Sequence, residues 1–299
     1  MRKSLVRAID AAAVRIAAGQ SLSTEEVHDT RKRIKRARSV LRILRPALDD
    51  DEFSGCDCLL RAAGKSLSTA RDAAVLAQTS ARLRARLDGA SPSKTKQQSL
   101  TKTRPGASTA DAARAHRNLR KGAATLAAAR LGRRGWKPLG SGVRAVYKRG
   151  RRLAAAVEQD ATTEALHAWR RHAKRYWHVL EIFEVVNPAR LAPIIGDARR
   201  LSDLLGEDHD LAMLAEHIRT RRGRPQSRDV ALLHAIEERR ARLGRRASRI
   251  GSKVYADRAR DVERRLQADW ERWRRATAQS TTSMPGRDGL EADAGLAGG

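Results

Sequence analysis

One basic segment occurs twice in this 299-residue chain, and its repetition constrains the fold more than any other feature of the sequence. Residues 27–38 read VHDTRKRIKRAR and residues 166–177 read LHAWRRHAKRYW. His28 therefore matches His167 at an offset of 167 − 28 = 139. A second match, at an offset of 210 − 72 = 138, pairs Asp72 with Asp210. Two matches at nearly one offset indicate an internal duplication, so we predict two similar halves.

Apolar residues recur with the period of an α-helix in the first copy and along most of the chain. Val27, Ile34 and Leu41 fall on one helical face, and Ser23 or Thr24 can cap the helix. Aromatic residues are scarce (five Trp, three Tyr and two Phe), which favours packed helices over a β-sandwich. We therefore predict an all-α fold. The expected helices cover residues 4–18, 24–48, 59–87, 110–131, 142–159, 163–186, 190–220 and 228–276.

Basic side chains occupy the other face of both copies. With 100° per residue, Arg31, Lys32 and Lys35 lie within about 60° of His28, and the second copy places His178 on the same arc as its basic residues. On one helix such a stripe would indicate an ordinary solvated face, but its repetition favours binding. The candidate binding residues are His28, Arg31, Lys32, Lys35, Arg38 and Arg42 in the first copy, His167, Arg170, Arg171, Lys174 and Arg175 in the second, and Lys148, Arg151 and Arg152 between them.

The charge of the chain indicates what such a stripe would bind. Lys and Arg number 62 against 34 Asp and Glu, which leaves a formal net charge of +28. A surface this basic repels itself, and a polyanion would relieve the repulsion and stabilise the fold. Of the basic residues 50 are Arg, whose planar guanidinium binds phosphate oxygens in pairs. A GC-rich genome would also enrich Arg, but it does not explain the net charge.

The remaining segments set the expected boundaries. Residues 88–110 are rich in Ser, Thr, Gly, Pro and Lys and are predicted to form a flexible basic loop, and residues 277–299 a disordered tail. We place the first half at residues 1–135 and the second at 136–276. No apolar run is long enough to cross a bilayer, and Cys56 and Cys58 are expected to be free thiols, so we predict a cytoplasmic protein that does not enter a membrane.

The two segments resemble the CHAD domain, the conserved histidine α-helical domain. The resemblance rests on VHDTRKRIKRARSVLRILRPAL and ALHAWRRHAKRYWHVLEIF, each followed by LSTARDAAVL or LLGEDHDLAML, together with YKRGRR, and it covers residues 1 to about 276. It implies two four-helix bundles related by a pseudo-twofold axis, a basic surface that binds inorganic polyphosphate, and targeting to polyphosphate granules. It also implies that the matching His, Arg and Lys residues of each half contact the polyphosphate. Trp177 stands where the first half has Arg38, so the halves are expected to bind unequally.

Two other functions compete with polyphosphate binding. Nonspecific nucleic-acid binding fits the charge, although the scattered Trp residues suit core packing better than base stacking. A metal-dependent phosphohydrolase could use His28 with Asp29 or His209 with Asp210. However, the repeat matches His28 with His167 rather than with His209, so the two dipeptides do not form one recurring unit. No carboxylate cluster or Gly-rich phosphate loop accompanies them. We therefore expect a non-catalytic protein with no cofactor and no metal. Its expected partner is polyphosphate, with other polyanions as further candidates. The sequence carries no signal for its oligomeric state.

One mutational expectation follows from the stripes. Replacing Arg31 and Lys35 by Ala, or Arg170 and Lys174 by Ala, should weaken polyphosphate binding. The same changes should leave thermal stability unchanged or raise it, because they relieve repulsion between like charges.

Overall fold

The computed structural model describes residues 2–16, 21–67, 79, 106–132, 135–220 and 227–282. Across these ranges the regular elements are helical, and one isolated β-bridge joins Leu22 to Ala107. The predicted all-α fold is thereby confirmed. The helices are α1 (Arg2–Val14), α2 (Thr24–Leu44), η1 (Arg45–Ala47), α3 (Asp50–Ser66), α6 (Thr109–Ala128), α7 (Trp136–Gln159), α8 (Thr163–Phe183), η2 (Glu184–Val186), α9 (Pro188–Thr220), α10 (Ser227–Val254) and α11 (Ala259–Thr282).

The structure corrects several expected helix bounds. Helix α3 begins at Asp50 rather than near residue 59, because Asp49 and Glu52 form a capping box ahead of the apolar residues. The single helix expected over residues 228–276 is two helices, α10 and α11, separated by residues 255–258. Helix α11 also continues to Thr282, past the expected start of the tail. Residues 88–105 of the predicted loop and 283–299 of the predicted tail lie outside the described residues.

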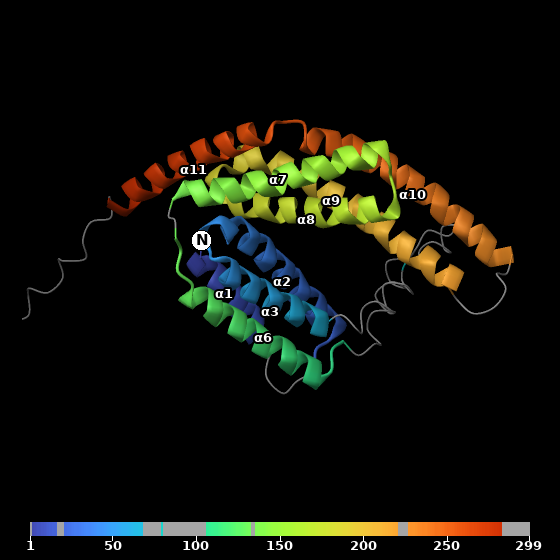
Figure 1. Cartoon of the computed structure of the whole chain (residues 1–299), viewed down its shortest axis with the longest axis horizontal. Coiled ribbons are helices and arrows are strands. Elements are labelled where there is room, and N and C mark those ends of the chain that lie inside the picture. Colours follow the sequence, from blue (N-terminus) through green and yellow to red (C-terminus); the bar gives the residue numbers. More distant parts are fainter. Residues whose placement is uncertain are drawn as a thin grey trace, which may run out of the picture.

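Two hydrophobic cores organise the helices (Figure 1). The first is filled by α1, α2, α3 and α6, with Leu41, Leu60 and Leu119 fully buried. The second is filled by α7 to α11 and contains most of the aromatic side chains, including Trp169 and Phe183. The first group therefore contains four described helices and the second contains five.

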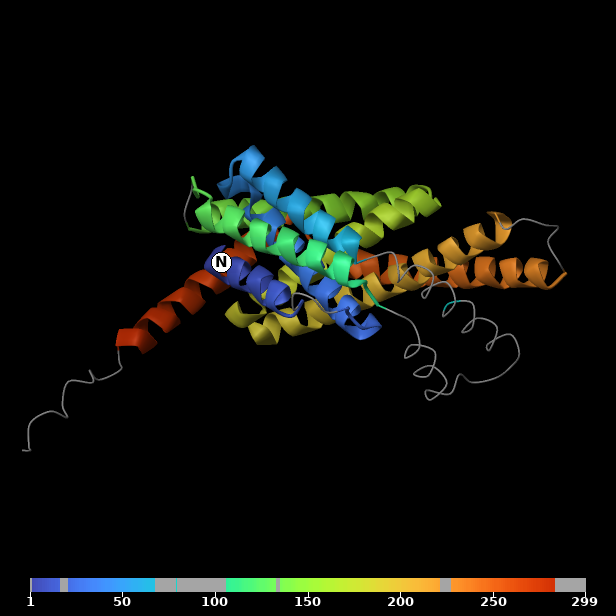
Figure 2. The same ribbon diagram turned by 90° about the horizontal axis from the view of Figure 1, so that it is seen from below.

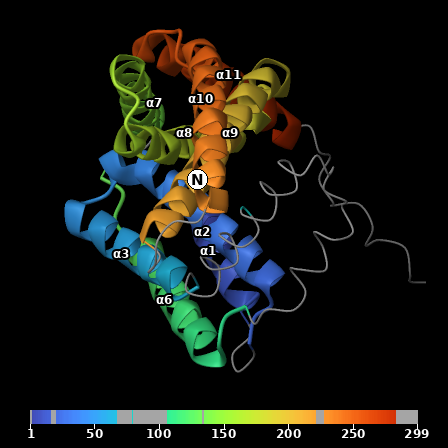
Figure 3. The same ribbon diagram turned by 90° about the vertical axis from the view of Figure 1, so that its right-hand side faces the viewer.

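Helix α2 joins the two groups, because it packs against both α7 and α8 (Figure 3). Its Ile43 side chain belongs to the second core, and Ile182 of α8 in turn packs against the first core. Helix α7 meets α2 at Gly142. A Cβ atom at residue 142 would lie 2.3 Å from the carbonyl oxygen of Ile43, so this close approach requires glycine.

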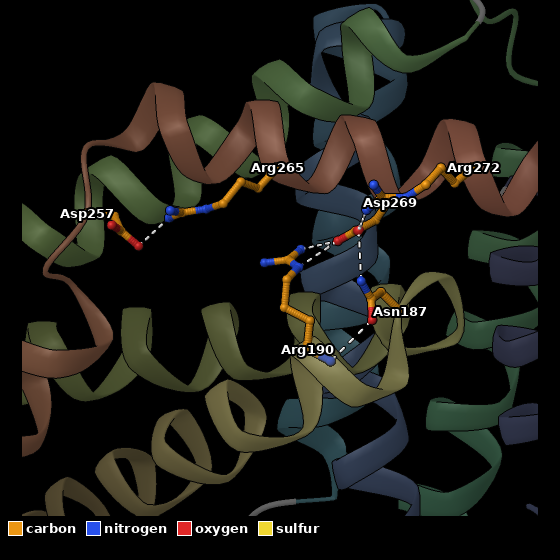
Figure 4. Close-up of polar contacts among 6 residues, drawn as sticks. All are labelled: Asn187, Arg190, Asp257, Arg265, Asp269 and Arg272. Atoms are coloured by element: carbon orange, nitrogen blue, oxygen red, sulfur yellow. Dashed lines mark hydrogen bonds and ion pairs between the residues drawn. The ribbon is translucent and has the colours of Figure 1, made fainter.

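Two long elements extend from the second group. Helices α9 and α10 pair along their length and project as an arm, while α11 leaves in the other direction (Figure 2). The buried Asp269 fixes α11 to the start of α9, because its carboxylate accepts hydrogen bonds from Asn187 Nδ2 at 2.8 Å and Arg190 Nε at 2.7 Å (Figure 4). Arg272 donates to the same carboxylate.

Candidate functional site: a cationic junction between two helix groups

The two helices that carry the basic stripes begin alike. The Ser23 hydroxyl caps α2 by accepting from the Glu26 backbone N–H at 3.2 Å, and the Glu26 carboxylate accepts from the Ser23 N–H at 2.8 Å. Thr162 caps α8 in the same way through the Ala165 N–H, at 3.1 Å. Residues 23 and 162 differ by 162 − 23 = 139, the offset of the sequence repeat. The two helices therefore begin at corresponding residues of the repeat.

Helices α2 and α8 contact each other through their C-terminal halves. Arg36 Nε lies 3.9 Å from the Glu181 carboxylate, and the guanidinium of Arg175 lies close enough to Arg42 for their charges to interact. His28 and His167 each precede the contact residues Arg36 and Arg175 by eight positions (36 − 28 and 175 − 167), which is about 12 Å of helix. The predicted stripes thus meet at the Arg38, Arg42, Arg171 and Arg175 end.

In the first stripe the side chains differ in how far they are exposed. His28 and Lys32 are exposed, whereas Arg31 and Lys35 are partly buried. The Arg31 Nη1 donates to the backbone carbonyl of Gly64 at 2.6 Å. Gly64 lies in the last turn of α3, where carbonyl groups have no partner within the helix. Arg31 therefore caps a neighbouring helix as well as contributing charge.

The second stripe contains a pair of histidines. His167 Nδ1 lies 3.0 Å from His209 Nδ1 of α9, and the two rings meet edge to face. Burial, the charges of Arg170 and His167, and the charge of Arg240 lower the pKa of His209 to about 4. Burial and the neighbouring Arg171 also lower the pKa of His167. Both imidazoles are consequently neutral at pH 7 in the free protein.

Arg170, the counterpart of Arg31, is also partly buried and lies against a glycine of the next helix. A Cβ atom at Gly206 of α9 would be 3.8 Å from Arg170 Nε. Arg171 is exposed, and Lys174 lies over the Trp177 ring at 5.9 Å. The residues at the Arg31 and Arg170 positions thus both contact the helix that follows their own.

The prediction that His178 belongs to the basic stripe is wrong. Its side chain is buried between the helix groups, and its Nδ1 lies 3.1 Å from the Glu181 carboxylate. Trp177 is buried too. The arc drawn from the 3.6-residue period counts this part of α8 as solvent-facing, whereas packing against α2 buries it.

A buried carboxylate holds the arginines of the first group at the junction. Asp57 of α3 accepts from Arg38 Nε at 2.8 Å and from Arg61 Nη2 at 2.9 Å, and Arg42 Nη2 lies 3.5 Å away. Burial opposes ionisation of Asp57, but the hydrogen bonds from Arg38 and Arg61 outweigh it and lower its pKa to about 2. Asp57 was not predicted as part of the site because the expected helix began after it.

The second group contributes Arg175 and His172 to the same junction. Arg175 Nη1 donates to the His172 ring, at 3.1 Å from Nδ1. Burial and the charges of Arg42 and Arg38 lower the pKa of Arg175 to about 10. Burial, with the charges of Arg175 and Arg149, lowers the pKa of His172 to about 4. The sequence predicted Arg175 but missed His172, although its spacing of three residues from Arg175 places both on one helical face.

The basic group on α7 is divided between two surroundings. Lys148 and Arg152 are exposed. Arg151 Nη1 donates to the backbone carbonyl of Asp257 at 3.2 Å, next to the Tyr147 hydroxyl, which donates to the same oxygen. Arg149 lies in the same basic group but was not among the candidate binding residues, and its charge helps to lower the pKa of His172.

The described parts of the chain contain no group of three or more His, Cys, Asp or Glu side chains placed to hold a metal ion. They also contain no helix with enough length and apolar character to cross a membrane. Cys56 is buried and Cys58 exposed, and both are free thiols as predicted. Asp72 of the second repeat match lies outside the described residues.

These features define a helical protein whose two cores share a junction rich in guanidinium groups. The family model described as the CHAD domain matches residues 3–219, and the chain belongs to this family. The match ends near the tip of α9, earlier than the sequence resemblance suggested, so α10 and α11 lie beyond it. No curated protein and no solved structure matches the chain.

Proposed function

We propose that the chain binds inorganic polyphosphate, without catalysis, along the basic surface that α2 and α8 present. The observation that carries the proposal is the junction of these helices, where Arg38, Arg42 and Arg61 of the first group surround the carboxylate of Asp57 and the charge of Arg175 of the second group acts on them. A chain of phosphates supplies evenly spaced negative charge and needs no base-reading groups. Membership of the CHAD family, which is linked to polyphosphate binding, supports the same conclusion.

The proposed contacts extend outward from this junction. They comprise His28, Arg31, Lys32, Lys35, Arg38 and Arg42 on α2, Lys148, Arg151 and Arg152 on α7, and His167, Arg170, Arg171, Lys174 and Arg175 on α8. The N-terminal turn of each stripe lies about 12 Å of helix before the contact, so a long polyphosphate would pass from one stripe through the junction to the other. Long chains should consequently bind more tightly than short ones.

We further propose that the two groups derive from duplicated four-helix bundles. Helix α2 spans 24–44 and α8 spans 163–183, and each is followed by a three-residue 3₁₀-helix, at 45–47 and 184–186. All of these bounds differ by 139. The exchange of Ile43 and Ile182 between the cores is also reciprocal, which supports a pseudo-twofold relation.

The decisive experiment compares polyphosphate with DNA. Isothermal titration of the full chain with long-chain polyphosphate and with single-stranded DNA of equal total charge should give tighter binding of polyphosphate at every salt concentration. The logarithm of the affinity should fall linearly with the logarithm of the salt concentration, as counterion release requires. Equal affinities for the two polymers would replace the proposal with nonspecific polyanion binding.

In cells, the proposal extends to recruitment to polyphosphate granules. A fluorescent fusion of the full chain should form foci in cells that accumulate polyphosphate and should be diffuse in cells that cannot synthesise it. Exchange of Arg171 for Glu, an exposed change on α8, should reduce the foci. Foci that persist without polyphosphate would show that another partner recruits the chain.

A further inference from the structure

The two ends of the α2 and α8 contact differ in charge although their positions correspond. At one end Arg36 of α2 faces Glu181 of α8. An offset of 139 takes Arg36 to Arg175 and takes Glu181 back to Arg42. The corresponding pair at the other end is therefore two arginines, whose charges repel each other. A salt bridge at one end is replaced by two like charges at the other.

The neighbouring positions change in the same direction. Arg149 of α7, beside His172, corresponds to Asp10 of α1, which pairs with Arg120 at 2.9 Å. Positions 10 and 181 are thus acidic, whereas the positions that match them in the repeat, 149 and 42, are arginines. One carboxylate, Asp57, faces the arginine-rich end, and Arg38, Arg42 and Arg61 already surround it.

The surroundings of Arg175 and His172 hold far more positive than negative charge. Across the described residues, Arg175 has no ion pair with a carboxylate, and its Nη1 donates to the neutral His172 ring. The charged groups that act on Arg175 and His172 are Arg38 and Arg42 from α2, Asp57 from α3, Arg149 from α7, and Arg171 from α8. Partly buried guanidinium groups gathered in this way are stabilised by an anion that bridges them.

We propose that Arg42, Arg149, Arg171, His172 and Arg175, the junction cluster, form a discrete site for one phosphoryl group and that its binding transfers one proton from solvent to His172. The site accepts orthophosphate or a single phosphate unit of a longer chain. This inference rests on the proposed function only for the longer chain, because orthophosphate binding can be measured by itself.

Proton uptake follows from the hydrogen bonds. In the free protein His172 accepts from Arg175, and burial with the surrounding arginines keeps its pKa low. A bound phosphoryl oxygen accepts the Arg175 N–H in its place and adds negative charge beside the ring. Both effects favour the imidazolium, which then donates a hydrogen bond of its own to the anion.

The experiment measures orthophosphate binding and proton uptake together. Titration calorimetry at about pH 6.5, in two buffers with different ionisation enthalpies, gives the number of protons taken up per anion bound. We expect uptake by the wild-type chain and none by His172→Gln. Arg42→Glu, which rebuilds across the junction the pair seen between Arg36 and Glu181, should weaken orthophosphate binding about tenfold or more.

Arg36→Glu is the matched control. It makes the same change of charge on the same helix, but at the end that lacks the cluster, so it should keep orthophosphate binding and proton uptake. If Arg42→Glu fails to fold by circular dichroism, the exposed Arg149→Gln provides the same test. The site would be overturned if Arg42→Glu, or Arg149→Gln in its place, bound orthophosphate with wild-type affinity and His172→Gln still took up a proton.

A parallel titration with long-chain polyphosphate separates the two proposals. Polyphosphate binding that is normal in every variant, together with unchanged orthophosphate binding, would remove the junction cluster and restrict polyphosphate binding to the parts of the two stripes outside it. Orthophosphate binding that depends on the cluster, in a wild-type chain that does not bind polyphosphate, would keep the site and remove the proposed function. Sulfate is a dianion with no titratable proton near neutral pH, so any proton uptake on sulfate binding comes from the protein alone. We expect this uptake in the wild-type chain and not in His172→Gln.

Discussion

Arg31 and Lys32 are adjacent in the first stripe, yet the structure gives them different roles. Arg31 donates to the Gly64 carbonyl at the end of α3, whereas the Lys32 side chain is exposed. We predict that Arg31→Ala lowers the free energy of unfolding by about 1 to 2 kcal/mol, because a charged hydrogen bond to a carbonyl in the last turn of α3 is lost. Urea unfolding at pH 7 measures the change. This revises the expectation that the Arg31 and Lys35 double variant would keep its stability.

Lys32→Ala is the control for this prediction. It removes the same charge one residue away and should change stability by less than about 0.5 kcal/mol. Both variants should weaken polyphosphate binding. Equal unfolding midpoints for the two variants would show that the hydrogen bond to Gly64 contributes nothing and that Arg31 acts through charge alone.

At the level of elements, the close approach of α7 to α2 depends on a residue without a side chain. A methyl group at residue 142 would meet the Ile43 backbone at 2.3 Å, and backbone atoms cannot move aside as a side chain can. Gly142→Ala should therefore force the helices apart and destabilise the protein by about 1 to 3 kcal/mol, despite the better helix propensity of Ala. Differential scanning calorimetry would show a lower Tm.

Gly244→Ala is the control for Gly142→Ala. Gly244 lies inside α10, and a Cβ atom there would meet nothing within 4 Å. Gly244→Ala should therefore raise stability by up to about 1 kcal/mol. If Gly142→Ala raised Tm as Gly244→Ala does, the contact between α7 and α2 would be looser than the structure shows.

The helices show which parts of the fold a sequence can predict. Helix α2 was placed closely, because its cap at Ser23 and its apolar period coincide. The start of α3 was missed because the acidic residues after Asp49 look like a loop until Glu52 is seen to complete a cap. The break between α10 and α11 has no strong signal, since residues 255–258 contain neither Gly nor Pro.

The sequence predicted which types of residue form the site, but it predicted much less of how these residues are arranged in space. The repeat selected the correct helices, α2 and α8, but helical angles alone could not show that their C-terminal halves contact each other. His178 was consequently taken for a surface residue, and Asp57, which comes from another helix, was not considered. The exposure of each charged side chain depends on contacts between segments that are distant in the sequence. The helical period of a single segment gives no information about such contacts.

For the whole molecule, buried histidines should make stability depend on pH. Burial and nearby arginines lower the pKa of His172 and of His209 to about 4, from an ordinary value of 6.5. Between these values the unfolded chain binds more protons than the folded one, so stability falls as the pH falls from 6.5 towards 4, and is fully present above 6.5. Urea unfolding from about pH 7.5 to about pH 4.5 should show this loss.

The double variant His172→Gln with His209→Gln tests the origin of this pH dependence. It should show a flatter dependence over the same range, because Gln cannot take up a proton. A slope as steep as that of the wild-type chain would assign the effect to other groups, such as the buried His178, whose pKa is also lowered by burial.

The exchange of isoleucines between the cores bears on how the chain can fold. The Ile43 side chain of α2 is buried in the second core, and the partly buried Ile182 side chain of α8 packs against the first. Residues 1–135 expressed alone would expose Ile43 to water, and we expect this fragment to associate or to be cleaved readily by protease. The full chain should melt in one cooperative transition, because neither core is complete until the other has formed.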